Sequence, residues 1–90
     1  MGTFHQDRGG LHGITVVVET IGPELYVGRC DHLDAGRIVL NDVDVHREGV
    51  DTISRQEYLE LAARLGTWKK YDRLVLSCQE VTAVKRLAEF

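Results

Sequence analysis

The order of hydrophobic and polar residues predicts five short β-strands in this chain. Runs rich in Val, Ile and Leu recur along it, and Gly, Pro or Asp residues separate most of them. β-Branched residues favour an extended backbone, and such turn residues end it. The predicted strands are residues 14–20, 25–32, 37–46, 73–78 and 81–87. The link between the last two is so short that it forces an antiparallel hairpin or a sharp corner.

Two of these strands carry irregularities that predict a strongly bent sheet. Gly28 interrupts the second strand, and an interior glycine usually marks a bulge, a bend or a close backbone approach. In the third strand the alternation breaks at Asn41 and Asp42, which indicates a bulge. Residues 33–36 form a tight connection between these two strands. Two antiparallel strands that are joined by a short loop and bend together are how a small β-barrel begins.

A different periodicity, that of an α-helix, occupies residues 55–65. Ser54 precedes Glu57 by three residues, which is the spacing of a capping box, and Gly66 stands where a C-cap glycine belongs. Between these caps the apolar residues repeat at helical spacing: Tyr58, Leu59, Leu61, Ala62 and Leu65. The sequence therefore predicts one amphipathic helix of about three turns. The pattern leaves open whether its apolar side covers the core or binds a partner.

The first 13 residues follow neither periodicity, because glycines interrupt them repeatedly. We expect residues 1–13 to form a flexible N-terminal arm. Residues 14–90 then form a single domain, since a chain of 90 residues has room for no more than one. So short a chain buries a limited core, and oligomerisation is a common way to stabilise it.

Composition and charge exclude several classes of protein. The net charge of −3 argues against a general nucleic-acid binder, which needs a basic surface. No apolar run approaches the roughly 18 residues of a membrane-spanning helix, so we expect no membrane association. Cys30 and Cys78 lie in predicted strands and belong to no CxxC pair. We expect them to be reduced thiols of a cytoplasmic protein.

The sequence also lacks the motifs of catalysis and of cofactor binding. It has no glycine-rich phosphate loop, no nucleophile elbow and no His-Glu metal helix. We therefore expect a protein that is no enzyme and has no catalytic residue, cofactor or metal site. Two sets of side chains that can bind metals alternate along the strands: Cys30, His32 and Asp34, and Asp42, Asp44 and His46. A polar, solvated face of a half-buried sheet explains both sets without a metal.

Two further stretches are compatible with a binding partner but have simpler explanations. Residues 68–71, Trp-Lys-Lys-Tyr, place two lysines between aromatic residues, a combination that serves single-stranded nucleic acid. The alternative is the start of a strand, with Trp68 packed under the preceding helix and the lysines in water. The centre of the chain, residues 42–60, is rich in carboxylates. It is either a solvated acidic face or a docking site for a basic partner.

The order of the predicted elements and one stretch of sequence resemble the Sm-like family of small β-barrels. The first motif of that family is a strand containing a glycine, an apolar residue followed by Asp, a short loop, and an apolar strand that ends in acidic residues. Residues 25–30, the pair Leu33-Asp34 and residues 38–42 resemble it in that order. The predicted helix falls in the variable loop of the family, whereas the usual N-terminal helix is not evident.

A second stretch resembles the second Sm motif, which is an apolar pair, an Arg-Gly turn and an apolar strand. Residues 75–78, followed by Val81 and Val84, resemble it. The similarity covers residues 14–46 and 71–87 in all. It implies a mainly β fold: a five-stranded, strongly bent antiparallel sheet or small barrel of the SH3-like type, with one α-helix inserted between strands three and four.

The resemblance also implies a homo-oligomeric ring. In this family the fourth strand of one subunit pairs with the fifth strand of the next. The corresponding interface residues here are Leu74, Val75, Leu76, Val81 and Val84. An apolar strand at an open sheet edge is an aggregation hazard unless it is paired, which favours the oligomer. In a monomer, Lys85 and Arg86 would instead protect the edge of the fifth strand.

For single-stranded RNA, the resemblance implies a site made by two loops, and this sequence matches it only in part. RNA-holding members use an Asp and an Asn of the first loop and an Arg of the second. Asp34 matches the Asp, Arg37 or Ile38 stands at the Asn position, and Ser77-Cys78 replaces the Arg-Gly turn. The candidate RNA-binding residues are thus Asp34, Arg37 and Ser77, with Arg37 as the substitute for the missing arginine. Alternatively, Asp34 only orders its own turn.

The sequence leaves two main hypotheses of function. In the first, the chain is a subunit of an Sm-like ring that binds RNA on one face. In the second, it is a protein–protein assembly module that keeps the fold, has lost the RNA pocket and binds a protein partner through the helix at residues 55–65. A small enzyme or a metal-binding barrel is a third and weaker hypothesis.

Overall fold

The computed structural model describes residues 11–90, which form one five-stranded antiparallel sheet and one α-helix. The strands are β1 (Thr15–Thr20), β2 (Glu24–Leu33), β3 (Arg37–Arg47), β4 (Tyr71–Ser77) and β5 (Val81–Arg86). The helix α2 (Arg55–Leu65) lies between β3 and β4, and the short 3₁₀ helices η1 (Cys78–Glu80) and η2 (Leu87–Glu89) follow β4 and β5. The predicted fold class is confirmed. Residue 78, predicted at the end of the fourth strand, begins η1 instead.

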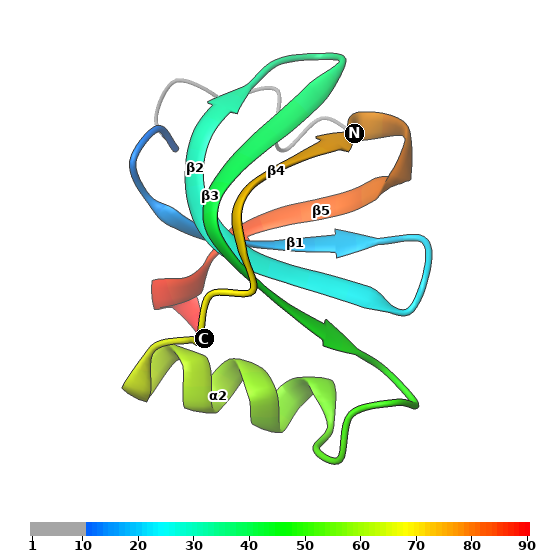
Figure 1. The fold of residues 1–90 in the computed structure, drawn as a ribbon, viewed down its shortest axis with the longest axis vertical. Coiled ribbons are helices and arrows are strands. Elements are labelled where there is room, and N and C mark those ends of the chain that lie inside the picture. Colours follow the sequence, from blue (N-terminus) through cyan, green and yellow to red (C-terminus); the bar gives the residue numbers. More distant parts are fainter. Residues whose placement is uncertain (1–10) are drawn as a thin grey trace.

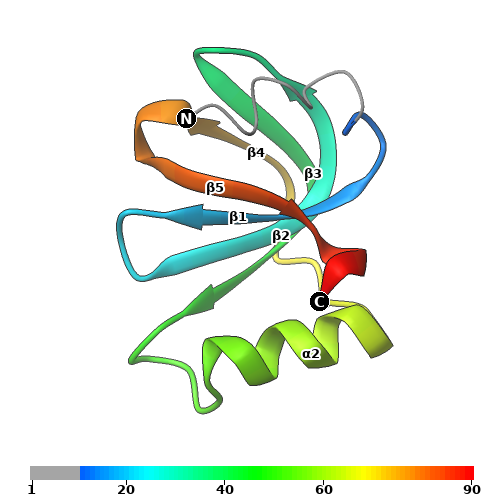
Figure 2. The same ribbon diagram turned by 180° about the vertical axis from the view of Figure 1, so that it is seen from behind.

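The strands follow the order β4-β3-β2-β1-β5 across the sheet, so β4 and β5 form its two edges. The long strands β2 and β3 bend strongly, and the sheet curls toward a barrel (Figures 1 and 2). Within the described residues, β4 pairs with β3 alone and β5 with β1 alone. The helix η1 connects the two edge strands. Each edge therefore offers one side of its backbone to a further strand.

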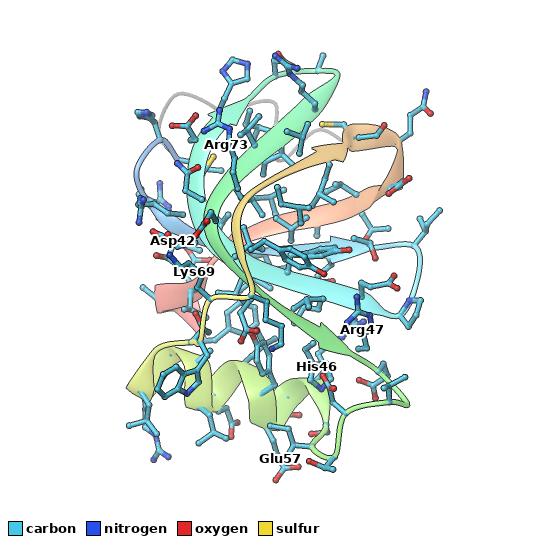
Figure 3. The ribbon with its side chains drawn as sticks, in the orientation of Figure 1. Asp42, His46, Arg47, Glu57, Lys69 and Arg73 are labelled. Carbon is cyan, nitrogen blue, oxygen red and sulfur yellow. The ribbon has the colours of Figure 1, made fainter. Side chains whose placement is uncertain are left out.

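The bend lies at Gly28, as the sequence predicts. The pairing of β2 with β3 shifts register between Val27 and Arg29, and Asp42 on β3 has a φ of 53°. This is the left-handed region, which Asp tolerates better than most residues. The Asp42 carboxylate lies 2.7 Å from Nη1 of Arg29 and 3.8 Å from Nζ of Lys69, so two cations hold it at the bulge (Figure 3).

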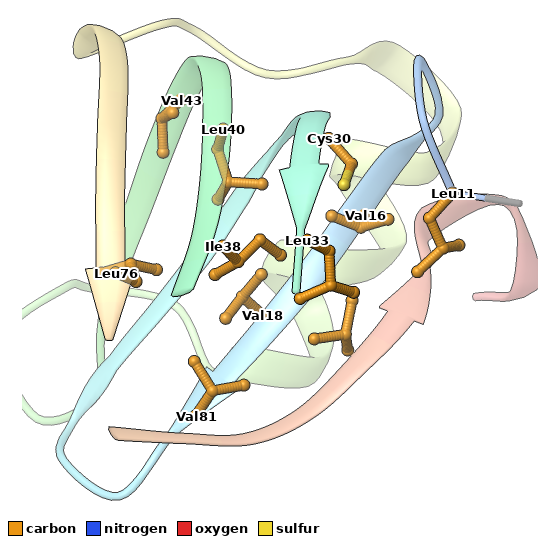
Figure 4. Close-up of a cluster of buried hydrophobic side chains, with 11 residues drawn as sticks. Leu11, Val16, Val18, Cys30, Leu33, Ile38, Leu40, Val43, Leu76 and Val81 are labelled. Carbon is orange, nitrogen blue, oxygen red and sulfur yellow. The ribbon is translucent and has the colours of Figure 1, made fainter. Parts of the chain in front are cut away.

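The larger of two core clusters fills the curled sheet (Figure 4). Its members come from all five strands and from the segment before β1: Leu11, Val16, Val18, Cys30, Leu33, Ile38, Leu40, Val43, Leu76, Val81 and Val84. Leu11 was predicted within a flexible arm, but its side chain is 2 % exposed. The N–H of Gly13 also donates to the carbonyl of Cys30 at 2.7 Å. The rest of the predicted arm, residues 1–10, lies outside the described residues.

The smaller core cluster joins α2 to the outer side of the sheet. Val17, Leu25 and Val27 are fully buried there against Leu59 of the helix. The apolar residues of α2 thus divide into two groups. Leu59 and Ala62 are buried, whereas Leu61 and Leu65 are exposed. No helix among residues 11–90 is long and apolar enough to cross a membrane.

The predicted capping box at the start of α2 is confirmed. The Ser54 hydroxyl accepts a hydrogen bond from the N–H of Glu57 at 3.1 Å, and the Glu57 carboxylate accepts one from the N–H of Ser54 at 3.3 Å. At the other end Gly66 has a φ of 85°, and its N–H donates to the carbonyl of Ala62. Both ends of the helix are therefore set by local sequence.

We expect Ser54→Ala to lower the free energy of unfolding by about 1 kcal/mol, because the N–H of Glu57 loses its acceptor. Ser54→Gly is the matched control and should cost only about a few tenths of a kcal/mol, since glycine also suits the N-cap position. Urea denaturation followed by circular dichroism measures both. Equal stability of the alanine variant and the original chain would contradict the role of the capping box.

Candidate nucleic-acid interface at the β2–β3 corner

The three residues predicted to bind RNA lie at one corner of the molecule. Asp34 is in the turn between β2 and β3, Arg37 begins β3, and Ser77 ends β4. Arg37 and Ser77 are direct partners in the pairing of β3 with β4. The N–H of Cys78 donates to the carbonyl of Gly36 at 3.1 Å, so the two loops are also joined through their backbones.

Asp34 orders the turn in which it lies, as the simpler of the two sequence interpretations expected. One carboxylate oxygen accepts hydrogen bonds from the N–H groups of Gly36 at 2.8 Å and Arg37 at 3.0 Å. The other lies 2.8 Å from Nε2 of His32. The N–H of Asp34 itself donates to the carbonyl of Arg37 at 3.1 Å. This network gives the corner a fixed shape.

These contacts hold the pKa of the Asp34 carboxyl at about 2, through the hydrogen bond to His32 first and the two backbone N–H groups next. A carboxylate with a depressed pKa in the folded state stabilises the fold above its unfolded pKa, and this stabilisation is lost as the pH falls through the folded value. We therefore expect the urea midpoint to fall between about pH 4 and pH 2. Asp34→Asn should flatten this part of the profile, and an unchanged profile would contradict the assignment.

Ser77 and Cys78, which replace the Arg-Gly turn, serve the structure of the corner. The Ser77 hydroxyl accepts a hydrogen bond from the N–H of Gln79 at 3.3 Å and so caps η1. The Cys78 thiol donates to the carbonyl of Asp34 at 3.4 Å, and burial raises the pKa of this thiol. Neither side chain replaces a guanidinium.

Arg37 and His32 are the side chains at this corner that can contact a ligand. Arg37 is exposed, and its guanidinium makes no hydrogen bond or ion pair with any residue in the range 11–90, although its backbone bonds to Asp34. His32 is half-exposed, with one ring nitrogen held by Asp34. The sequence did not link His32 to RNA. It showed only that His32 alternates with Cys30 and Asp34, a spacing that was considered for metal binding.

Neither of the two alternating sets, Cys30, His32 and Asp34 or Asp42, Asp44 and His46, brings its three side chains together in the described part of the chain. A register shift between Cys30 and His32 separates their faces, so the Cys30 side chain enters the core while His32 points outward. Among residues 11–90, no three His, Cys, Asp or Glu side chains converge on a point that would hold an ion. The solvated-face explanation is also wrong for Asp44 and His46, which are 4 % and 1 % exposed.

Asp44 and His46 instead help to hold α2 against β3. The Asp44 carboxylate accepts hydrogen bonds from the Tyr58 hydroxyl at 2.8 Å and from the Lys70 ammonium group. Burial and the nearby Asp44 raise the pKa of the Tyr58 phenol. The His46 ring stacks on Tyr58 with centroids 5.0 Å apart, and its Nε2 lies 2.8 Å from the carbonyl of Ile53.

The stretch of residues 68–71 does not provide a basic strip for nucleic acid. Lys69 pairs with Asp72 at 2.9 Å, and Lys70 pairs with Asp44, so neighbouring carboxylates offset both charges. The alternative interpretation is right that the stretch leads into a strand, since β4 begins at Tyr71. Its expectation that Trp68 packs under the helix is wrong, because that side chain is 87 % exposed.

The predicted interface residues divide between the core and the surface. Leu76, Val81 and Val84 are 5–8 % exposed and belong to the core of their own chain, and Leu74 packs against it. Val75 is 53 % exposed on the edge strand β4. What the two edges offer a neighbouring subunit is therefore mainly backbone, together with Val75. The interface itself stays a prediction.

Comparisons with known proteins reveal relatives in structure alone. No protein-family model and no curated protein sequence matches this chain. Among solved structures, the Sm protein of Pyrococcus abyssii in complex with a uridine heptamer is similar, with a TM-score of 0.61 and 18 % identity over 87 % of this chain and 89 % of that one. A chain in the crystal structure of the NatC complex bound to CoA has a TM-score of 0.61 and 14 % identity, over 90 % and 88 %. At identities this low, the structural similarity establishes a shared fold and nothing more.

Proposed function

From the Sm-like fold of this chain, we propose that it is a ring-forming subunit that binds single-stranded RNA at the β2–β3 corner. Its role is binding and assembly rather than catalysis. The observation that carries the proposal is the exposed Arg37 beside the ordered turn of Asp34, directly opposite the end of β4.

The corner has the chemistry that reading unpaired bases requires. A guanidinium stacks on a base and donates hydrogen bonds to its edge, and an imidazole ring provides a second stacking surface. In this chain Arg37 provides the guanidinium and His32 the imidazole. Asp34 contacts both residues: it accepts a hydrogen bond from the N–H of Arg37 and fixes the ring of His32. An Sm protein with the same fold is found with a uridine heptamer, which supports single-stranded RNA as the class of ligand.

The open edges of the sheet support the ring. β4 and β5 end the sheet on opposite sides, and each has a neighbour on one side only among the described strands. Pairing of β4 in one subunit with β5 in the next is a head-to-tail contact, which closes into a ring when the rotation allows it. It would also satisfy edges that otherwise promote aggregation.

The RNA site is tested with labelled oligouridine and oligoadenosine by fluorescence anisotropy at two salt concentrations. We expect Arg37→Ala to weaken binding about tenfold, the order of one lost base–side chain stacking contact. Arg64→Ala is the matched control, since it removes an exposed arginine from α2 at the other end of the molecule (Figure 1). Equal losses for both variants would indicate general charge attraction and contradict the site.

The ring is tested separately by measuring mass in solution with light scattering. The original chain should be an oligomer, and Val75→Lys should dissociate it by placing a charge on the β4 edge. Ile21→Lys changes an even more exposed apolar residue in the turn after β1 and should leave the mass unchanged. A strict monomer would contradict the ring.

A ring that binds no RNA would favour the assembly module instead. The missing Arg-Gly turn and the net charge of −3 are compatible with that outcome. A chain of similar fold belongs to the NatC complex, so this fold also occurs within protein assemblies.

A further inference from the structure

One side of α2 and the segment that follows it carry apolar side chains that belong to neither core cluster. Leu61, Leu65 and Trp68 are 39 %, 78 % and 87 % exposed. They line a hollow of about 270 Å³, at whose base lie Tyr58 and the buried Asp44. We name this hollow the α2 groove. The helix α2, whose side chains line it, lies at the end of the molecule away from the β2–β3 turn (Figures 1 and 2).

The stability of the fold does not explain this surface. The helix is held to the sheet by Leu59 and Ala62 on one side and by the hydrogen bond from Tyr58 to Asp44 on another. Leu65 and Trp68 extend beyond both contacts into solvent. Tryptophan is among the residues that most often dominate the energy of protein–protein interfaces.

A second hollow shares the residue Leu61 with the α2 groove and has a different character. Leu61 lines both, and the second, of about 490 Å³, is bordered by Glu57, Glu60, Arg64 and Phe90. Glu57 points away from the sheet on the outer side of the helix (Figure 3). Its carboxylate accepts the hydrogen bond from the N–H of Ser54 in the capping box. The apolar α2 groove thus has, next to Leu61, two acidic side chains and one basic side chain.

We propose that the α2 groove binds a basic, amphipathic segment of a protein partner. An apolar side chain of that segment enters between Leu65 and Trp68, and its Lys or Arg residues lie along Glu57 and Glu60. Helical segments with apolar residues on one face bind grooves of this kind. The acidic centre of the sequence provides the charge that such a segment complements.

Charge and area argue against the other occupants. Two copies of the chain that meet through α2 would bring Glu57 and Glu60 of both copies together, which is repulsive. Three partly exposed side chains also fall well short of the roughly 800 Å² that each partner contributes to a standard interface. RNA is disfavoured because the same carboxylates repel its phosphates.

The chain contains its own reporter for a test, because Trp68 is its only tryptophan. The probe is a synthetic 12-residue peptide of Leu and Lys in helical alternation, and its counterpart has Glu in place of every Lys. The Lys peptide should shift the Trp68 emission to shorter wavelength in a saturable titration, whereas the Glu peptide should leave it unchanged. Leu65→Ser should weaken the binding at least tenfold, and Glu60→Lys about fivefold.

Ile21→Ser is the matched control, because Ile21 is 74 % exposed and lies in the turn between β1 and β2. It should bind the Lys peptide as the original chain does. An unchanged Trp68 emission, equal binding of the Glu peptide, or an equal loss in Ile21→Ser would each overturn the proposal. Two other results would also overturn it. If Leu65→Ser dissociates an oligomer, the groove binds a second copy of the chain, and if oligouridine shifts the Trp68 emission, the groove binds RNA. Loss of RNA binding in Arg37→Ala does not affect this test.

Discussion

Asp44→Ala is expected to lower the free energy of unfolding by about 3 kcal/mol, one of the two largest effects of a single substitution in this chain. The Asp44 carboxylate is 4 % exposed and accepts hydrogen bonds from the Tyr58 hydroxyl, the Lys70 ammonium group and the N–H of Val45. Removing it leaves the Tyr58 hydroxyl without an acceptor in a partly buried site. It also removes the side-chain hydrogen bonds that join β3 to Tyr58 of α2 and to Lys70 in the segment before β4.

Three further variants separate the parts of this effect. Tyr58→Phe should cost about 2 kcal/mol, since it removes one donor from a buried charge and keeps the ring that stacks on His46. Lys70→Met should cost less than Asp44→Ala, because Lys70 is half-exposed and water screens its charge. Asp72→Ala is the matched control: its carboxylate is 88 % exposed and water screens its pair with Lys69, so its effect should be much smaller than that of Asp44→Ala.

Urea denaturation at neutral pH measures the four variants on the same scale. If Asp44→Ala and Asp72→Ala differ by less than about 0.5 kcal/mol, the network does not hold the helix. A variant that fails to fold is consistent with the prediction only when Tyr58→Phe folds and is destabilised.

The parts of the fold that depend on neighbours in sequence were predictable from sequence. The spacing of Ser54, Glu57 and Gly66 determines both ends of the helix, because capping involves residues within one turn. Gly28 and Asp42 marked the bend for a similar reason: each position needs a backbone or a space that few residues allow. The helix caps and the bend could therefore be predicted without knowing which residues distant in sequence contact them.

The roles of Asp44, His46 and Trp68 were not predictable, because each depends on where α2 packs. Alternation on β3 correctly placed Asp44 and His46 on one face, and a polar face is normally solvated. In this chain the inserted helix covers that end of β3 and buries both residues. With the helix in this position, the Trp68 side chain is left in solvent. The packing angle of a helix on a sheet has no signature in a local pattern.

The candidate site was predictable in its members but not in its chemistry. Asp34, Arg37 and Ser77 meet because the register of β3 with β4 places Arg37 opposite Ser77. The family resemblance implied a site made by these two loops, but it did not give this register. The use of Asp34 by its own turn and by His32 is a matter of side-chain geometry within the corner. Because Asp34 and Ser77 already have structural partners, Arg37 is the predicted site residue that is left to contact RNA.

The second large effect is expected at the bend, where Gly28→Val should lower the free energy of unfolding by about 3 kcal/mol or more. A Cβ at Gly28 would lie 3.2 Å from the carbonyl oxygen of Asn41, and equally close to side-chain atoms of Leu40 and Val43. The oxygen belongs to the backbone of the paired strand, and both side chains are buried, so none of the three can move without disturbing the core.

Gly28→Ala adds the Cβ alone and should cost about 1–3 kcal/mol, less than valine because the branched methyl groups are absent. Gly36→Ala is the matched control, in the turn that connects β2 and β3. A Cβ there would meet only the Asp34 carboxylate, at 3.5 Å, which is an ordinary contact. We expect it to change stability by no more than about 0.5 kcal/mol. If Gly28→Ala proves as stable as Gly36→Ala in urea, the close approach of β2 and β3 is not what requires glycine at the bend.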